Sequence, residues 1–86
     1  MHGLHLTADL HGCRGERRCL TDAPYLLARC AAIVARAGMQ VVGQAFHAFS
    51  APAGAESGLT ATLLLAQSHV CVHTWPERDA VTLDVY

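Results

Sequence analysis

The segment LLLAQSHVCVHTWPE, residues 63–77, places reactive side chains in what otherwise reads as a hydrophobic strand. Its serine, Ser68, directly follows Gln67. If the Ser68 hydroxyl attacks the Gln67 carbonyl, the peptide bond becomes an ester, and β-elimination then cleaves the chain between the two residues. Hydrolysis of the resulting dehydroalanine, with loss of ammonia, leaves a pyruvoyl group, a ketone that forms an imine with an amine and accepts electrons during decarboxylation. The plainer interpretation is that Ser68 is a hydrogen-bonded turn residue.

The sequence contains no lysine. Enzymes that hold pyridoxal phosphate or form their own Schiff base through an amine use a lysine, and the phosphate loop of nucleotide hydrolases also needs one. These three mechanisms are excluded. Any carbonyl or imine chemistry in this chain therefore requires an electrophile that is made in another way.

Three potential metal ligands follow the serine at alternate positions, namely His69, Cys71 and His73. Side chains of a strand alternate between its faces, so these three share one face and form a plausible set for zinc or copper. No fourth ligand follows at a familiar spacing, and hydrogen-bonded histidines on a half-exposed strand are the simpler interpretation. We therefore assign no metal ligands on this strand.

Aromatic and acidic residues near the ends of two predicted strands suit a planar, hydroxylated ligand. Phe49 lies next to the small-residue loop 50–58, where its ring can stack on a flat ligand, and Trp75 can serve in the same way. Glu77 follows in a tight turn, where its carboxylate can accept hydrogen bonds from two ribose hydroxyls. The alternatives are core aromatic residues and a solvated glutamate.

Hydrophobic periodicity predicts the elements that position these residues. A helix is predicted to begin at Thr21 or Asp22 and to end at Gly38. Its apolar stripe consists of Leu27, Cys30, Ala31 and Val34. Strands are predicted over residues 4–11, 40–49, 59–66, 69–75 and 80–86. This order predicts an α+β fold, a two-layer α/β sandwich with one helix packed on a largely antiparallel sheet, which we expect dimerisation or a missing C-terminal half to complete.

The 86 residues are expected to form a single domain, residues 1–86, that buries only a small core. Hydrophobic residues make up 52% and charged residues 15%, with a formal net charge of -1, which is typical of a globular protein and not of a nucleic-acid binder. No apolar run reaches the roughly 18 residues of a membrane span, and no secretory signal is visible. We expect a cytoplasmic protein with no nucleic-acid or membrane partner and with free thiols at its four cysteines.

Four motifs together resemble the bacterial and archaeal S-adenosylmethionine decarboxylase proenzymes. They are HLTADLHGC (residues 5–13), VVGQAFHAF (41–49), LLAQSHVCVHTWPE (64–77) and LDVY (83–86). They span nearly the whole chain in the family's order, and SH-x-x-x-HTWPE is highly specific. The resemblance implies a pyruvoyl enzyme of polyamine synthesis that decarboxylates S-adenosylmethionine to the aminopropyl donor for spermidine. It also implies a two-layer sandwich that forms a homodimer, with active sites between the subunits.

By position, Ser68 matches the self-processing serine of the family. Cleavage between Gln67 and Ser68 would leave residues 1–67 as one chain and residues 68–86 as the chain that bears the pyruvoyl group. The family normally has glutamate where this chain has Gln67. Because the attacked atom is a backbone carbonyl, we expect that cleavage does not require this acid, although its rate can differ.

Four further residues match the family by position. His73 matches the histidine that assists processing, and Thr60 stands where the family usually has a serine with a role in processing. Phe49 matches the phenylalanine that stacks on adenine, and Glu77 matches the glutamate that binds the ribose hydroxyls. The loop 50–58 is longer than the family's usual connection and can reshape the mouth of the site.

In the family, the chain continues beyond the strand that matches LDVY into a Thr-Cys-Gly segment, whose cysteine protonates the substrate carbon, and then into a further helix and strands. We therefore expect the C-terminal part of the family fold to be absent from residues 1–86. Cys71 and Cys13 offer alternative thiols, but no sequence argument places either near the substrate. Two alternative functions stay open: the same pyruvoyl chemistry on another amino acid such as arginine or ornithine, and a non-catalytic regulatory relative.

Ser68 and His73 are five residues apart, so an unbroken strand would point them to opposite faces. They serve one site only if the chain bends at Ser68 or if cleavage frees it. We expect the bend, because Gln67 and Ser68 lie where two apolar runs meet.

Overall fold

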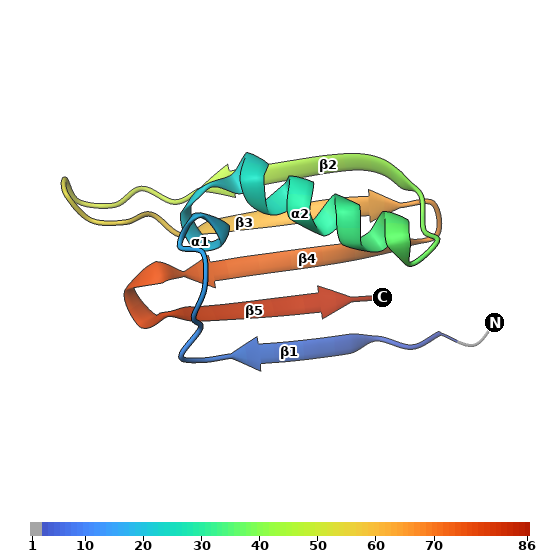
Figure 1. Ribbon diagram of the computed structural model, residues 1–86, viewed down its shortest axis with the longest axis horizontal. Coiled ribbons are helices and arrows are strands. Elements are labelled where there is room, and N and C mark those ends of the chain that lie inside the picture. The colour runs from blue at the N-terminus through green and yellow to red at the C-terminus, as the bar shows by residue number, and fades with distance from the viewer. Residues whose placement is uncertain (1–2) are drawn as a thin grey trace.

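The computed structural model describes residues 3–86. Its elements are, in order, β1 (Leu6–Leu10), α1 (Arg18–Thr21), α2 (Ala23–Arg36), β2 (Val41–Ala48), β3 (Leu59–Leu65), β4 (Ser68–Trp75), the short 3-10 helix η1 (Pro76–Arg78) and β5 (Ala80–Val85). The strands form one antiparallel sheet in the order β1-β5-β4-β3-β2, and the main helix, α2, lies on one face of it (Figure 1). The predicted fold class, one helix packed on an antiparallel sheet, is confirmed.

Both ends of α2 are fixed by the residues that the sequence indicates. At its start, the carboxylate of Asp22 accepts a hydrogen bond from the backbone N–H of Tyr25 at 3.1 Å, which satisfies one of the free donors of the first turn. At its end, Gly38 adopts a φ of +84°, which favours glycine. The backbone N–H groups of Gly38 and Met39 donate to the carbonyls of Ala35 and Val34, both at 3.0 Å, and so stop the helix.

The structure adds one short helix that the sequence pattern does not reveal. α1 is only four residues long, which is too short for hydrophobic periodicity to indicate it. It buries Leu20, whose carbonyl accepts a hydrogen bond at 2.7 Å from the hydroxyl of Thr74 on β4. α1 therefore attaches the start of α2 to the same end of the sheet at which β4 ends.

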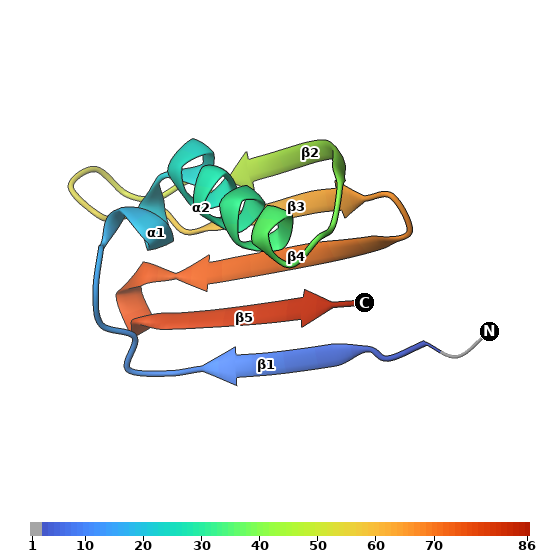
Figure 2. The same cartoon turned by 45° about the vertical axis from the view of Figure 1, so that its right-hand side comes forward.

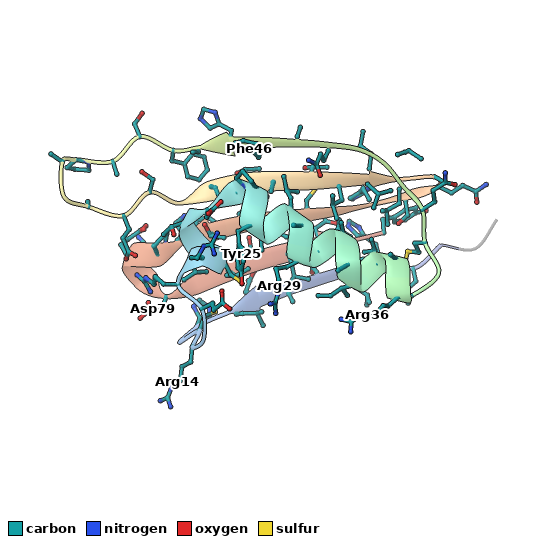
Figure 3. All side chains as sticks on the ribbon, turned by 45° about the horizontal axis from the view of Figure 1, so that its top comes forward. Arg14, Tyr25, Arg29, Arg36, Phe46 and Asp79 are labelled. Atoms are coloured by element: carbon teal, nitrogen blue, oxygen red, sulfur yellow. The ribbon has the colours of Figure 1, made fainter. Side chains whose placement is uncertain are left out.

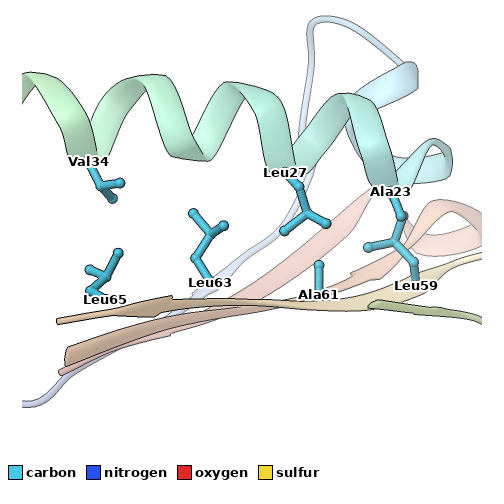
Figure 4. Close-up of a cluster of buried hydrophobic side chains, with 7 residues drawn as sticks. All are labelled: Ala23, Leu27, Val34, Leu59, Ala61, Leu63 and Leu65. Carbon is cyan, nitrogen blue, oxygen red and sulfur yellow. The ribbon is translucent and has the colours of Figure 1, made fainter. Parts of the chain in front are cut away.

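The core lies between α2 and β3 (Figure 4). Alternate residues of β3 are buried beneath the helix, as a half-buried strand requires. Leu27 and Val34 of the predicted stripe are buried, and Cys30 and Ala31 pack partly buried against the same cluster. The buried members of the cluster are Ala23, Leu27, Val34, Leu59, Ala61, Leu63 and Leu65. Each fully buried leucine contributes about 1.5 to 3 kcal/mol relative to exposure, so this cluster fixes α2 over β3.

α2 does not cover the whole sheet. It contacts β2 and β3, whereas β5 and β1 extend beyond it in both ribbon views (Figure 2). The register of β1 and β5 places Leu6 and Leu10 on the same face as the helix, yet they are 55% and 46% exposed. The expectation that one helix covers five strands poorly is confirmed.

Strand boundaries differ from the predicted ones by one or two residues. β1 covers Leu6–Leu10 instead of 4–11, and β5 ends at Val85 instead of 86. The four cysteines are free thiols, as expected. Within residues 3–86, no helix has the length and apolar character that crossing a membrane requires.

Candidate active site

The β3–β4 hairpin brings together two of the predicted site residues. Its register pairs Thr60 with His73, and Thr60 Oγ1 lies 2.9 Å from His73 Nδ1, within hydrogen-bond distance. Because their neighbours Leu59 and Ala61 are buried beneath α2, Thr60 and His73 face the opposite side of the sheet. We call this side, which carries Thr60 and His73 and faces away from α2, the open face.

Ser68 lies far from this pair. It is the first residue of β4 and pairs with Leu65, which is buried beneath α2. The expected bend at Ser68 is wrong, because the chain reverses earlier, in a two-residue turn at Ala66 and Gln67, and β4 continues unbroken from Ser68 to Trp75. Five residues of strand separate Ser68 from His73 by about 16 Å and turn them to opposite faces.

The turn before Ser68 borders an open hollow. Gln67 and Ser68 line it together with residues 38–40, which connect α2 to β2, and the backbone N–H of Ala66 donates to the Gln40 carbonyl at 3.1 Å. A loop residue of a two-residue hairpin lies outside the hydrogen-bonded ladder, so the Gln67 carbonyl is not committed to a partner strand. The peptide bond between Gln67 and Ser68 is thus at an accessible end of the sheet.

A second pocket, of about 270 Å³, lies at the other end of β4 and gathers the residues expected to bind a nucleoside. Phe49, Trp75 and Glu77 all line it, together with the loop 50–58. Phe49 is held in place because its backbone N–H donates to the Gly58 carbonyl at 2.9 Å, across the base of the loop. The pocket adjoins the Thr60–His73 pair, since the rings of His73 and Trp75 lie 6.1 Å apart.

Arg17 fixes the two segments that border this pocket. Its Nε donates to both carboxylate oxygens of Glu56 in the loop, at 2.9 and 2.8 Å, and its Nη2 donates to the Pro76 carbonyl at 2.6 Å. A further ion pair joins it to Asp79, which Figure 3 shows at the sheet end nearest α1. The hydrogen bonds from Arg17 lower the pKa of Glu56, and the two carboxylates raise that of Arg17.

A buried threonine ties the pocket to the core. Thr74 is fully buried, and its hydroxyl accepts a hydrogen bond from the backbone N–H of Leu59 at 3.0 Å while it donates to the Leu20 carbonyl. Gly58 packs against the same residue so closely that a Cβ there would lie 2.3 Å from the Thr74 carbonyl oxygen. Only glycine fits at this position, which sets where the loop rejoins β3.

The three possible ligands on β4 do not converge on one point. Cys71 Sγ lies 3.3 Å from Thr62 Oγ1, His73 contacts Thr60, and His69 Nε2 lies 3.3 Å from Asp84 Oδ1. Each therefore has its own partner, because alternate residues of a strand are about 6.6 Å apart along it. Cys71 shares the open face with His73, whereas Cys13 lies in the loop after β1, with its thiol 3.8 Å from the Leu10 carbonyl.

The network around Arg17 was missed by the sequence analysis. Arg17, Glu56 and Asp79 lie far apart in the chain and form no motif. The only available signal is the basic segment RGERR, residues 14–18, and a segment of that kind is usually solvated. Its role depends on the fold, which brings α1, the loop 50–58 and η1 to one end of the sheet.

Comparison with known proteins identifies the family. The S-adenosylmethionine decarboxylase family matches residues 4–86. An S-adenosylmethionine decarboxylase proenzyme from Pyrobaculum neutrophilum is 38% identical over 86 residues, which cover 98% of this chain and 63% of that protein. One from Clostridium botulinum strain Hall is 29% identical over 84 residues, which cover 98% of this chain and 66% of that protein.

A solved structure shares the fold. The crystal structure of adenosylmethionine decarboxylase from Aquifex aeolicus superposes with a TM-score of 0.74 and 26% identity, over 93% of this chain and 60% of that one. The chain thus spans at most about two thirds of the length of these relatives. Because the family matches residues 4–86, nearly the whole chain, the chain belongs to the S-adenosylmethionine decarboxylase family.

Proposed function

We propose that this chain, as a single domain, cleaves itself between Gln67 and Ser68 and that the pyruvoyl group formed from Ser68 serves the decarboxylation of S-adenosylmethionine. Family membership supports the substrate, and the relatives are named proenzymes, which supports the cleavage. The observation that carries the proposal is the place of the Gln67–Ser68 bond, directly after a two-residue hairpin turn at an open hollow.

Cleavage at this bond leaves the sheet intact. Ser68 and the residues after it stay paired with β3 on one side, through the pairs from Leu65–Ser68 to Thr60–His73, and β4 stays paired with β5 on the other. The two product chains would therefore stay together without a covalent link. Self-cleavage elsewhere in β4 would instead interrupt its hydrogen-bonded ladder.

The residues of the second pocket suit the adenosine part of the substrate. The Phe49 ring is 39% exposed and offers a flat face for a purine, and Glu77 offers a carboxylate for two ribose hydroxyls. Trp75 and the base of the loop complete the walls. Once formed, the pyruvoyl group supplies the electron sink for the loss of carbon dioxide.

A single protomer cannot bring the Ser68 end to this pocket, because they lie at opposite ends of β4. We propose a homodimer in which two open faces meet, related by a two-fold axis that runs across the strands. Such an axis places the hairpin end of one β4 over the other end of its partner, and so brings the Ala66–Gln67 turn near the partner's pocket and Thr60–His73 pair. Because Ser68 lies on the helix face of the uncut strand, the turn must rearrange for the Ser68 hydroxyl to reach the partner's open face. The uncovered open face supports this arrangement.

Release of carbon dioxide from carboxyl-labelled S-adenosylmethionine tests the proposed activity. We expect turnover by the wild-type chain and none by Ser68→Ala, which lacks the hydroxyl that starts cleavage. Turnover of arginine or ornithine in place of S-adenosylmethionine would contradict the proposed substrate. Equal activity of Ser68→Ala and wild type would overturn the pyruvoyl mechanism.

Mixed dimers test the arrangement of the site. In this test Ser68→Ala and His73→Ala chains are co-expressed. If Ser68 and His73 of one site come from different protomers, a mixed dimer has one site with both residues intact. Random pairing would then recover about a quarter of the wild-type activity. No recovery, from two variants that both form dimers, would show that each site is built from one chain.

A further inference from the structure

A separate cluster of reactive side chains lies on the open face, at the end of the sheet that holds the β3–β4 turn. It consists of His5, His69 and Asp84, which come from the approach to β1, from β4 and from β5. Tyr86 lies among them, with its ring 5.6 Å from that of His5 and 6.2 Å from that of His69. None of these residues lines the pocket of Phe49 and Glu77.

The strand register brings the two imidazoles to one carboxylate. β5 lies between β1 and β4, and the backbone N–H of Tyr86 donates to the His69 carbonyl at 3.2 Å, so His5 and His69 flank β5 on either side. Both rings present the same atom, Nε2, to Asp84 Oδ1. His69 Nε2 lies 3.3 Å from it, and His5 Nε2 forms a second, closer contact.

The hydrogen bond from His5, followed by that from His69, holds the pKa of Asp84 below its ordinary value. In the single protomer all three side chains are between about a third and a half exposed, so a small ion can reach them from solvent as long as no second open face covers them.

We propose that His5, His69 and Asp84 form a binding site for a divalent transition-metal ion of the Zn²⁺ class. The three ligand atoms lie within 4.8 Å of one another, and ligands of one zinc ion, each about 2.0 to 2.1 Å from the metal, are separated by roughly 3.3 Å. A small side-chain adjustment therefore suffices. Two imidazoles and one carboxylate favour Zn²⁺, Co²⁺ or Ni²⁺ over Ca²⁺ or Mg²⁺, which prefer oxygen ligands.

The ion would replace the direct contacts between the imidazoles and the carboxylate. Three protein ligands leave one position of a tetrahedral ion for water or for an incoming anionic group. Tyr86, whose ring lies nearly parallel to that of His69, forms a wall beside the site. All the ligands come from one protomer, so the site needs neither a partner nor cleavage to form. In the proposed homodimer it would lie between the two open faces.

Isothermal titration of the chelator-treated full chain with Zn²⁺ alone tests this proposal. We expect one equivalent to bind with a micromolar dissociation constant. His5→Ala and Asp84→Asn should each weaken binding at least tenfold, whereas His11→Ala, which removes another exposed histidine, should leave it unchanged. Asp84→Asn preserves the shape of the side chain and so separates ligation from folding, which circular dichroism checks in every variant.

Co²⁺ provides a second readout, because its visible absorption reports the ligands directly. A spectrum without sulfur-to-metal charge transfer is expected for two nitrogens and one oxygen. The proposal fails if the wild-type chain binds no Zn²⁺, if His5→Ala binds it as tightly as wild type, or if the Co²⁺ spectrum shows thiolate ligation by one of the free cysteines.

Discussion

Thr60 and His73 face each other across the β3–β4 hairpin, with Thr60 Oγ1 2.9 Å from His73 Nδ1, while Ser68 stands at the other end of the same strand. The contact fixes the imidazole ring through Nδ1, so we expect Nε2 to be the nitrogen that exchanges protons during processing. The Thr60–His73 contact is formed within each protomer, but it lies about 16 Å from Ser68 of the same protomer. This separation is the reason for placing the complete site between two protomers.

The hydroxyl of Thr60 should be needed for fast self-cleavage. Thr60→Val keeps the shape of the side chain but cannot hydrogen-bond to His73, so we expect cleavage to slow by about tenfold or more. Thr60→Ser retains the hydroxyl and should cleave nearly as fast as wild type. The cleaved fraction, followed over time on denaturing gels, measures the effect. Equal rates for Thr60→Val and wild type would remove the pair from the processing machinery.

The buried Thr74 should contribute strongly to stability. Thr74→Val leaves the Leu59 N–H and the Leu20 carbonyl without their partner, which we expect to cost about 2 to 3 kcal/mol of the free energy of unfolding. Thr82→Val, at a half-buried position of β5, is the matched control and should change stability by less than about 1 kcal/mol. Urea denaturation in a Ser68→Ala background, where the chain stays whole, gives the comparison. Equal losses for the two variants would contradict the prediction.

The Arg17 network should make stability depend on pH. The pKa of Glu56 is lowered in the folded chain, so its contribution is fully present above its unfolded value of 4.5 and is lost as the pH falls through the folded value. We expect Arg17→Gln to lower the Tm at pH 7, and the Tm difference from wild type to shrink as the pH is lowered below 4.5 and through the folded pKa of Glu56. The control is Arg14→Gln, since Figure 3 shows Arg14 pointing away from the fold. A Tm difference that does not change with pH would exclude this linkage.

The pocket residues should act on substrate binding. We expect Phe49→Ala and Glu77→Gln each to raise the KM for S-adenosylmethionine by about tenfold or more. The first removes the stacking surface, and the second replaces one of the two carboxylate acceptors for the ribose hydroxyls by an NH2 donor and removes the charge. Phe46→Ala is the control, since Phe46 is an exposed phenylalanine of β2 outside this pocket (Figure 3). If all three variants kept the wild-type KM, the nucleoside site would lie elsewhere.

The sequence was sufficient for the elements whose signals are local. The α2 caps at Asp22 and Gly38 follow from backbone requirements that only certain residues meet, and alternate burial along β3 follows from strand geometry. The motif around Ser68 was specific enough to indicate the family, which the match over residues 4–86 confirms.

The sequence could not supply relationships that depend on register and on distant segments. Periodicity predicted β3 and β4 but not the register that pairs Thr60 with His73. It also led us to expect a bend at Ser68, whereas the chain turns at Ala66 and Gln67, before that residue. Arg17 reaches Glu56 only because α1, too short for a periodic signal, turns it toward the loop. The approach of His5 to Asp84 likewise requires β1 to pair with β5.

Intact-mass spectrometry of the freshly purified chain, beside Ser68→Ala, tests whether the chain cleaves itself between Gln67 and Ser68. We expect two fragments from the wild-type chain, residues 1–67 and residues 68–86, with the second lighter by one ammonia than a peptide that begins with serine. The variant should show one uncut chain. A single uncut chain in both samples would contradict the claim that this protein makes its own cofactor at Ser68.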